Sequence, residues 1–260
     1  MTTIQTLRLH RTRVLELYAR GESAAKISQK LLNRATYTHA VLRLLRENGV
    51  NPRTYSEASR KYVFDDSIFE SVDSPEKAYW LGFIIADGSI FTKKNSLKIE
   101  LAVKDSQHLY SFSKFLKSSL PVNFYRNGSS AQVCVVSQKI VEDLAKFGII
   151  QNKSFTVRVP SLPSFLRSHL WRGIFDGDGW ISVNMKRRLA AGVCGNIHVM
   201  SSLSEFLWGL GIPNSVYPHK SIYRVQLYAK RAHGFLKAIY ENETVSLERK
   251  KLKFKMLGVH

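Results

Sequence analysis

Two segments of this chain repeat each other at a constant spacing. Asp178 lies 91 residues after Asp87, and seven further pairs of positions at that spacing carry the same residue type. These pairs are Trp80 and Trp171, Gly82 and Gly173, Gly88 and Gly179, Ile90 and Ile181, Ser113 and Ser204, Phe115 and Phe206, and Leu116 and Leu207. Agreement at so many positions without a gap indicates a duplicated half-domain. The chain must therefore fold into an architecture that contains two similar halves.

The hydrophobic pattern predicts the same order of elements in both halves. In the first half we expect helices over 77–86, 106–116 and 138–147, and strands over 89–91, 97–103, 122–126 and 131–136. In the second half we expect helices over 165–175, 203–209 and 231–240, and strands over 180–184, 190–197, 216–218 and 223–227. This order, αββαββα twice, predicts an α+β fold with tandem repeats related by a pseudo-two-fold axis.

The first helix of each half carries small residues and ends in Asp-Gly. Gly82 and Ala86 lie four residues apart in one helix, as do Gly173 and Gly177 in the other. Small residues at this spacing allow two helix backbones to approach closely. If these helices pack together, the two aspartates meet at helix ends that carry partial negative charge. Divalent cations would stabilise that arrangement, and oxygen ligands suit Mg²⁺. The alternative is that each Asp-Gly pair is only a turn.

The two helix ends resemble a known motif. The segments "WLGFIIADG" (Trp80–Gly88) and "WRGIFDGDG" (Trp171–Gly179) are similar to the LAGLIDADG motif of homing endonucleases. Both copies depart from it, because Ile85 replaces an acid that Asp176 keeps, and Arg172 stands where a small or apolar residue is usual.

The resemblance extends from about Phe64 to the C-terminus and carries implications for the fold and the site. It implies a single-chain nuclease whose strands form a saddle that straddles DNA. It also implies two or three Mg²⁺ ions, with Asp87 and Asp178 as their ligands together with Gly88 and Gly179. Such a site would hydrolyse phosphodiester bonds by metal-assisted catalysis.

One candidate lysine follows the last helix of each half. The segment "GIIQNKSF" is similar to a family segment with a lysine near the active site, which corresponds to Lys153. In the second half "SLERKKLKF" matches the same place, with Lys250 as the counterpart and Arg249 beside it. A lysine there could stabilise charge that develops on the phosphate. The alternative is that both lysines are ordinary basic surface residues or phosphate contacts.

The charge of the chain favours nucleic acid as its partner. It has 39 Lys and Arg against 20 Asp and Glu, a formal net charge of +19, which draws a protein to polyanions. No apolar run is long enough to span a membrane, and we expect no membrane partner. The candidates for DNA contacts in the repeats are Lys93, Lys94, Lys98, Arg126, Arg187, Arg188, Lys220, Tyr223, Arg224 and Gln226.

The first fifty residues differ in pattern from the repeats. They predict three short helices, the first of which continues to Gly21, and this arrangement indicates a helix-turn-helix module. The last helix, near 36–48, would enter the major groove. The alternative is a small packing module with solvated charges. The candidates for DNA contacts here are Arg34, Thr36, Tyr37, His39, Arg43 and Arg46.

The sequence therefore predicts four parts: a DNA-binding module over 1–50, a linker over 51–74, and half-domains over 75–160 and 161–260. We expect a monomeric, Mg²⁺-dependent, site-specific endonuclease of double-stranded DNA with a long target site. We expect it inside the cell, in the cytoplasm or an organelle matrix, since no secretory signal is present. The alternatives are an RNA maturase that binds intron RNA, and a catalytically silent DNA-binding regulator of the same fold.

Overall fold

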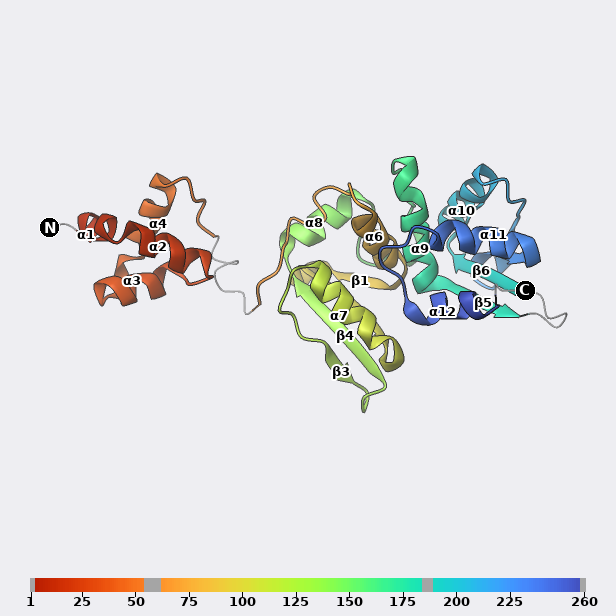
Figure 1. The fold of residues 1–260 in the computed structure, drawn as a ribbon, viewed down its shortest axis with the longest axis horizontal. Helices are drawn as coiled ribbons and strands as arrows, with labels where there is room; N and C mark the ends of the chain where they lie inside the picture. The colour runs from red at the N-terminus through yellow and green to blue at the C-terminus, as the bar shows by residue number, and fades with distance from the viewer. Residues whose placement is uncertain (1–2, 54–61, 184–188, 258–260) are drawn as a thin grey trace. The chain divides into compact units, whose positions relative to one another are not determined.

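The chain folds into two compact units that divide between Val63 and Phe64 (Figure 1). The computed structural model describes residues 3–53, 62–183 and 189–257. We call the two parts the N-terminal unit and the repeat unit. None of the described helices is long and apolar enough to cross a membrane.

The N-terminal unit consists of short helices around a small apolar core. Its helices are α1 (Thr3–Leu9), α2 (Arg11–Ala19), α3 (Ala24–Leu32) and α4 (Thr38–Glu47), with a 3₁₀ turn over Ala35–Tyr37. The pattern predicts one helix over the first of these stretches, whereas the structure divides it at His10, whose backbone lies outside the helical region. Ser23 caps α3 by accepting a hydrogen bond from the Lys26 backbone. Leu7, Val14, Ile27, Val41 and Leu45 are fully buried and hold the helices together.

Residues near the predicted linker belong to the two units. The Arg53 guanidinium lies 4.2 Å from the centre of the Tyr18 ring and donates to the carbonyls of Tyr18, Gly21 and Glu22. The N-terminal unit thus includes Arg53. On the other side, Phe69 is fully buried and its ring lies 5.7 Å from that of Phe115 in the repeat unit.

The repeat unit contains the predicted αββαββα order twice, which confirms the α+β fold class. The first half consists of α6 (Pro75–Asp87), β1 (Gly88–Phe91), β2 (Ser96–Ala102), α7 (Ser106–Phe115), β3 (Asn123–Tyr125), β4 (Ser130–Val136) and α8 (Gln138–Lys146). The second half consists of α9 (Ser164–Asp178), β5 (Gly179–Val183), β6 (Leu189–Gly195), α10 (Ile197–Gly209), β7 (Val216–His219), β8 (Ile222–Tyr228) and α11 (Ala229–Tyr240). A further helix, α12 (Glu248–Leu257), follows.

Each half forms one four-stranded antiparallel sheet with the same strand order. The orders are β1-β2-β4-β3 and β5-β6-β8-β7. Helices α7 and α8 pack on the first sheet, and α10 and α11 pack on the second (Figure 1). Buried residues such as Ile99, Val133, Val193 and Leu227 face these helices. Their neighbours along each strand point to the opposite face and are half-buried or exposed, except Gly192, which is buried against the Trp180 ring.

Helix α10 differs most from the length that its pattern predicts. Helix α10 begins at Ile197, six residues before the predicted start, and β6 ends at Gly195. The reason is Asn196, whose side chain accepts a hydrogen bond from the Val199 backbone at 3.0 Å. A capping residue thus starts the helix where the apolar pattern still resembles a strand.

Candidate active site at the paired helix ends

Helices α6 and α9 are in direct backbone contact. A Cβ atom added at Gly82 would lie 2.1 Å from the Leu170 carbonyl oxygen, and one at Gly173 would lie 2.0 Å from the Tyr79 carbonyl oxygen. Toward the C-terminal ends, a Cβ at Gly177 would lie 2.3 Å from the Cβ of Ala86. The structure therefore places all four small residues of the two motifs in one helix interface.

This interface brings the two motif aspartates together. The position of a Cβ at Gly177, next to Asp178, is 3.2 Å from Oδ2 of Asp87. Burial raises the pKa of the Asp87 carboxyl. The Asp178 residue is exposed in part, but desolvation of its carboxyl, followed by the charge of Asp87, raises its pKa to about 6. Each carboxylate is thus more costly to ionise than in water.

The glycines after the aspartates allow an abrupt passage from helix to strand. A Cβ at Gly88 would lie 2.6 Å from the Ile84 side chain, and one at Gly179 would lie 2.4 Å from the Phe175 ring. Only glycine fits at these two positions. They can supply backbone carbonyl groups to a ligand, and the carbonyl of Gly179 already accepts a hydrogen bond from the Lys250 amine.

The donor groups at the helix ends fit a hard divalent cation. The carboxylates of Asp87 and Asp178 accept no hydrogen bond from the residues that the structure describes, so their oxygen lone pairs are open. No group of three or more His, Cys, Asp or Glu side chains gathers among the described residues. Two carboxylates with raised pKa suit Mg²⁺, which binds through few protein oxygens and retains water.

Lys250 lies at the end of α9. Its amine donates to the carbonyls of Phe175 and Asp176, both at 2.7 Å, to that of Gly177 at 3.2 Å, and to that of Gly179. Burial lowers the pKa of Lys250 to about 8. The ammonium is therefore the group that offsets the negative end of this helix.

Lys153 approaches the same carboxylates in a different way. It begins a 3₁₀ turn, Lys153–Phe155, and its side chain is buried with 6% of the residue exposed. Burial lowers the pKa of Lys153, while the charges of Asp178 and then Asp87 oppose this change. Its amine donates no hydrogen bond to any residue in the described part of the chain.

The segments that carry Lys153 and Lys250 are each hydrogen-bonded to the other half of the repeat unit. Asn196, in the second half, donates to the carbonyls of Ser154 and Val157 at 3.2 and 3.0 Å. Arg249, beside Lys250, donates to both carboxylate oxygens of Asp105 in the first half, at 3.0 and 2.9 Å. Each lysine accordingly acts more strongly on the aspartate of the other half. Lys250 lowers the pKa of Asp87 more than Lys153 does, and Lys153 lowers the pKa of Asp178 more than Lys250 does.

A buried polar network next to the site was not expected from the sequence. Asp176 accepts hydrogen bonds from the hydroxyls of Tyr79 at 2.9 Å and Tyr240 at 2.6 Å, and from the Leu247 backbone at 2.6 Å. Burial raises the pKa of Asp176 to about 6. The only sequence signal was that Asp176 keeps an acid of the motif.

Arg172 extends this network. It is fully buried and donates to the carbonyls of Val245 at 2.7 Å and Ile239 at 2.8 Å. Its third partner is the ring nitrogen Nδ1 of His169 at 2.9 Å. Arg172 departs from the family motif, and its guanidinium is what anchors the segment between α11 and α12.

The predicted DNA contacts in the repeat unit differ in environment. Lys98 pairs with Glu100 at 3.1 Å, and Arg126 lies 3.7 Å from the same carboxylate. Arg224 is half-buried on β8, and its Nε has no hydrogen-bond partner among the described residues. Lys93, Lys94 and Lys220 are exposed in turns. Arg187 and Arg188 lie outside the described residues.

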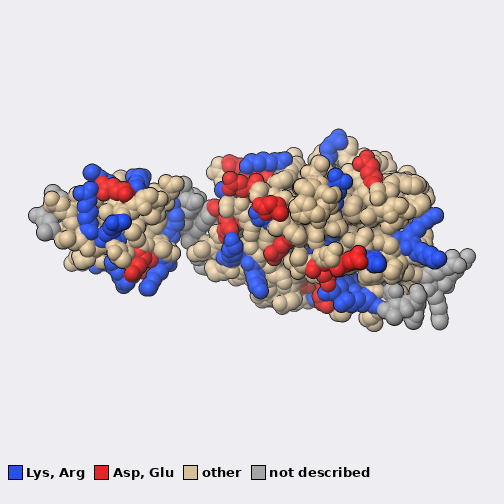
Figure 2. Space-filling model, turned by 45° about the horizontal axis from the view of Figure 1, so that its top comes forward, with Lys and Arg blue, Asp and Glu red and all other residues tan. Residues whose placement is uncertain are grey.

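The predicted contacts in the N-terminal unit are exposed, except Tyr37, which is half-buried. Arg34 and Thr36 lie around the 3₁₀ turn before α4. Arg43 on α4 forms an ion pair of 2.9 Å with Glu47, which also pairs with Arg8. On the viewed face of this unit in Figure 2 basic side chains predominate over acidic ones, whereas the two kinds are more evenly mixed on the repeat unit.

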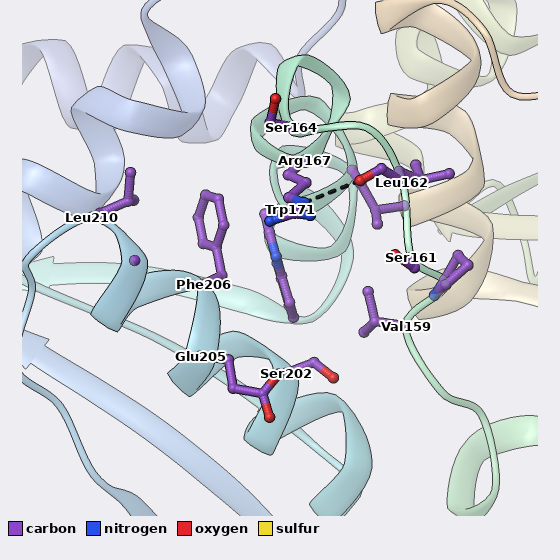
Figure 3. A pocket seen from close by; sticks show the side chains of 13 residues that line it. Val159, Ser161, Leu162, Ser164, Arg167, Trp171, Ser202, Glu205, Phe206 and Leu210 are labelled. Atoms are coloured by element: carbon purple, nitrogen blue, oxygen red, sulfur yellow. Dashed lines mark hydrogen bonds between the residues drawn. The ribbon is translucent and has the colours of Figure 1, made fainter.

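A groove elsewhere in the repeat unit does not resemble a reaction centre. It lies between the segment Val159–Ser164, the first half of α9 and α10 (Figure 3). The rings of Trp171 and Phe206 stack in it at 5.8 Å, and its charged lining residues are Arg167 and Glu205. Trp171 is seven residues from Asp178, about 10 Å along the helix. The groove therefore lies apart from the paired carboxylates.

Comparison with known proteins supports the fold at the level of structure. No protein-family model matches the sequence, and no curated protein is significantly similar to it. Solved structures do match. Meganuclease I-SmaMI bound to uncleaveable DNA covers 71% of this chain and 90% of its own, with a TM-score of 0.52 and 12% identity.

Two further structures give the same result. The LAGLIDADG homing endonuclease I-GzeII in complex with its DNA target has a TM-score of 0.50 and 13% identity, and covers 72% of this chain and 90% of its own. The LAGLIDADG meganuclease I-AabMI bound to uncleaved DNA has a TM-score of 0.50 and 11% identity, and covers 69% and 87%. At these identities the likeness concerns the fold.

Proposed function

This chain has the two-repeat fold of the single-chain LAGLIDADG homing endonucleases, and on that premise we propose that it is a site-specific, Mg²⁺-dependent endonuclease of double-stranded DNA. The observation that carries the proposal is the meeting of Asp87 and Asp178 at the ends of two helices in backbone contact. Two open carboxylates at this place have no structural partner among the described residues, so their role is to bind a ligand.

The residues of the site divide the chemistry of phosphodiester hydrolysis among them. Asp87 and Asp178 would hold the divalent ions, and the carbonyl of Gly88 would be an additional oxygen ligand. When bound there, such ions would supply Lewis-acid stabilisation of the phosphate charge and would make a bound water more acidic. Lys153 adds positive charge beside the carboxylates, where it can bind phosphate oxygens.

The two sheets supply the surface for DNA. Their uncovered faces carry polar residues such as Lys98, Gln132, Arg224 and Gln226, which alternate with core residues along the strands. Such side chains can donate to and accept from base edges, while basic residues in turns bind phosphates. One chain contains both halves, so the enzyme acts as a monomer.

The N-terminal unit extends the DNA contact as a helix-turn-helix module. Residues 1–63 contain 12 Lys and Arg against 4 Asp and Glu. Helix α4 follows α3 after a short turn, as a recognition helix does. A second contact of this kind lengthens the target site, which the repeat unit alone would leave shorter.

Cleavage selection tests the proposal. The protein is incubated with a plasmid library of random inserts in Mg²⁺ or EDTA, and cut ends are sequenced beside those from the double variant Asp87→Asn, Asp178→Asn. We expect cuts at one long site, absent with EDTA and in the double variant. Salt-sensitive binding to DNA without cleavage would favour the silent regulator, and binding to structured RNA without cleavage would favour the maturase.

A further inference from the structure

The two lysines at the site are not equivalent, although the halves repeat each other. Lys153 lies 66 residues after Asp87, whereas Lys250 lies 72 residues after Asp178. Lys153 begins a 3₁₀ turn, and Lys250 lies in the first turn of α12. The repeat therefore breaks down at the one type of residue that would contribute positive charge to both reaction centres.

The hydrogen-bond donors of the Lys250 amine are all taken up by groups of the protein itself. An ammonium group has three donors, and four carbonyls at the end of α9 lie within hydrogen-bonding distance of this one. Its side chain also lies 5.4 Å from the centre of the Phe175 ring, measured from the amine nitrogen. The amine cannot donate to a substrate phosphate without leaving these carbonyls.

The chain holds Lys250 in this place from two sides. Asp176 accepts from the backbone of Leu247, three residues before the lysine, and Arg172 donates to the carbonyl of Val245. Arg249 is paired with Asp105. Both α9 and the first half of the repeat unit thus fix the start of α12.

Lys153 has the opposite character. Its stem is buried, its segment is fastened by Asn196, and its amine has no hydrogen-bond partner among the described residues. Helix α6, which carries Asp87, receives no hydrogen bond from a described lysine or arginine at its last carbonyls. One half therefore has a capped helix and a saturated lysine, and the other has an open helix end and an available lysine.

We propose that Lys250 is a positioning residue, which caps α9 and holds Asp178, whereas Lys153 is the only one of the two that contacts the substrate. This inference rests on the proposed nuclease function. It follows that the two DNA strands meet unequal centres, and that the strand whose phosphate lies against Lys153 depends on that amine far more than the other strand does.

The first part of the test needs no DNA. Thermal unfolding is measured for Lys250→Met, Lys250→Gln, Lys153→Met and the control Lys237→Met, whose lysine is an exposed residue of α11. We expect Lys250→Met to lower Tm by roughly 3–10 °C, because several buried carbonyls lose their donor. Lys250→Gln keeps two donors and should melt between Lys250→Met and the wild type. Lys153→Met and the control should stay within roughly 1–2 °C of the wild type.

The second part measures each strand separately. A target duplex with a different fluorophore on each strand reports both cleavage rates in one reaction. We expect Lys153→Met to slow one strand by roughly 10²-fold or more and at least tenfold more than the other, whereas Lys250→Met slows both strands by similar factors. Hydrogen exchange of the last turn of α9 should accelerate in Lys250→Met alone.

The outcomes separate this inference from the proposed function. A wild-type Tm for Lys250→Met, or equal slowing of both strands by Lys153→Met, would overturn the division between the lysines. If the wild-type protein cuts no target, the nuclease function fails, and with it the role of Lys153 at the substrate. The melting and exchange results would still decide whether Lys250 caps α9.

Discussion

Arg249 and Asp105 join the two halves of the repeat unit through a two-pronged ion pair. The residues are 144 positions apart, and their hydrogen bonds measure 3.0 and 2.9 Å. Asp105 is largely buried, and it adds to the raised pKa of Asp87. The pair thus links the end of the chain to the first half and lies within electrostatic reach of the candidate site.

Breaking this pair should weaken the repeat unit. We expect Arg249→Met and Asp105→Asn each to lower the free energy of unfolding, with a coupling energy of about 1 kcal/mol, because the arginine is partly exposed to solvent. Urea unfolding of the two single variants and the double variant measures the coupling. Strictly additive effects would show that the ion pair contributes nothing.

The helix interface should tolerate no side chain at Gly173. We expect Gly173→Ala to destabilise the repeat unit by about 3 kcal/mol or more, since the new Cβ would lie 2.0 Å from a backbone oxygen that cannot move freely. Gly209→Ala is the matched control, because its Cβ would meet nothing within 4 Å in α10. The control should be neutral or slightly stabilising, and equal losses for both variants would contradict the close contact.

His108 should make stability depend on pH. It is buried, its Nε2 lies 2.8 Å from the Tyr79 hydroxyl, and burial lowers its pKa from 6.5 to about 4. Between those values the unfolded chain binds a proton that the folded chain does not. As the pH falls through this window, the free energy of unfolding should therefore decrease by up to about 3 kcal/mol on account of this group.

The comparison with His108→Gln isolates that contribution. Glutamine keeps a donor for the tyrosine but does not titrate. Urea unfolding of both proteins at several pH values should give a difference that changes between pH 4 and 6.5 and is constant above it. The comparison is needed because Asp176 has the opposite effect on stability. Burial raises its pKa to about 6, so its contribution to the free energy of unfolding increases as the pH falls.

Metal binding should be visible without any DNA. We expect Mg²⁺ to raise the Tm of the wild-type protein and EDTA to reverse the change, because a ligand that binds only the folded state stabilises it. The double variant Asp87→Asn, Asp178→Asn should show no Mg²⁺ effect. Without metal it should melt above the wild type, since it removes two carboxylates whose charged forms are disfavoured. Glu142→Gln, on the exposed face of α8, controls for net charge.

Two arginines of the N-terminal unit should differ in their effect on DNA affinity. Arg34 is exposed and forms no ion pair with a described residue, whereas Arg43 is already paired with Glu47. We expect Arg34→Ala to weaken binding several-fold and to reduce the slope of log Kd against log salt by about 1. Arg43→Ala should do less. Fluorescence anisotropy at several salt concentrations measures both, and identical results would argue against the pairing.

The sequence by itself predicted the order of the helices and strands and singled out Asp87 and Asp178 as a pair. The spacing between the two motifs, the alternation along the strands and the small residues Gly82, Ala86, Gly173 and Gly177 predict a duplicated α+β fold. These features are local or repeated in the sequence, so they can be recognised without knowing which residues surround them in the folded protein. The start of α10 was missed because a single capping residue, Asn196, outweighs the strand-like pattern around it.

Only the tertiary structure decided what each charged side chain does. Lys153 and Lys250 both follow the last predicted helix of their half, but one amine has no partner among the described residues and the other is held by four carbonyls. Arg172 and Asp176 appear as small departures within a motif, yet they anchor a segment some 70 residues further along the chain. The physical reason is that burial and hydrogen bonding depend on neighbours distant in sequence, and these neighbours set the role of a charge.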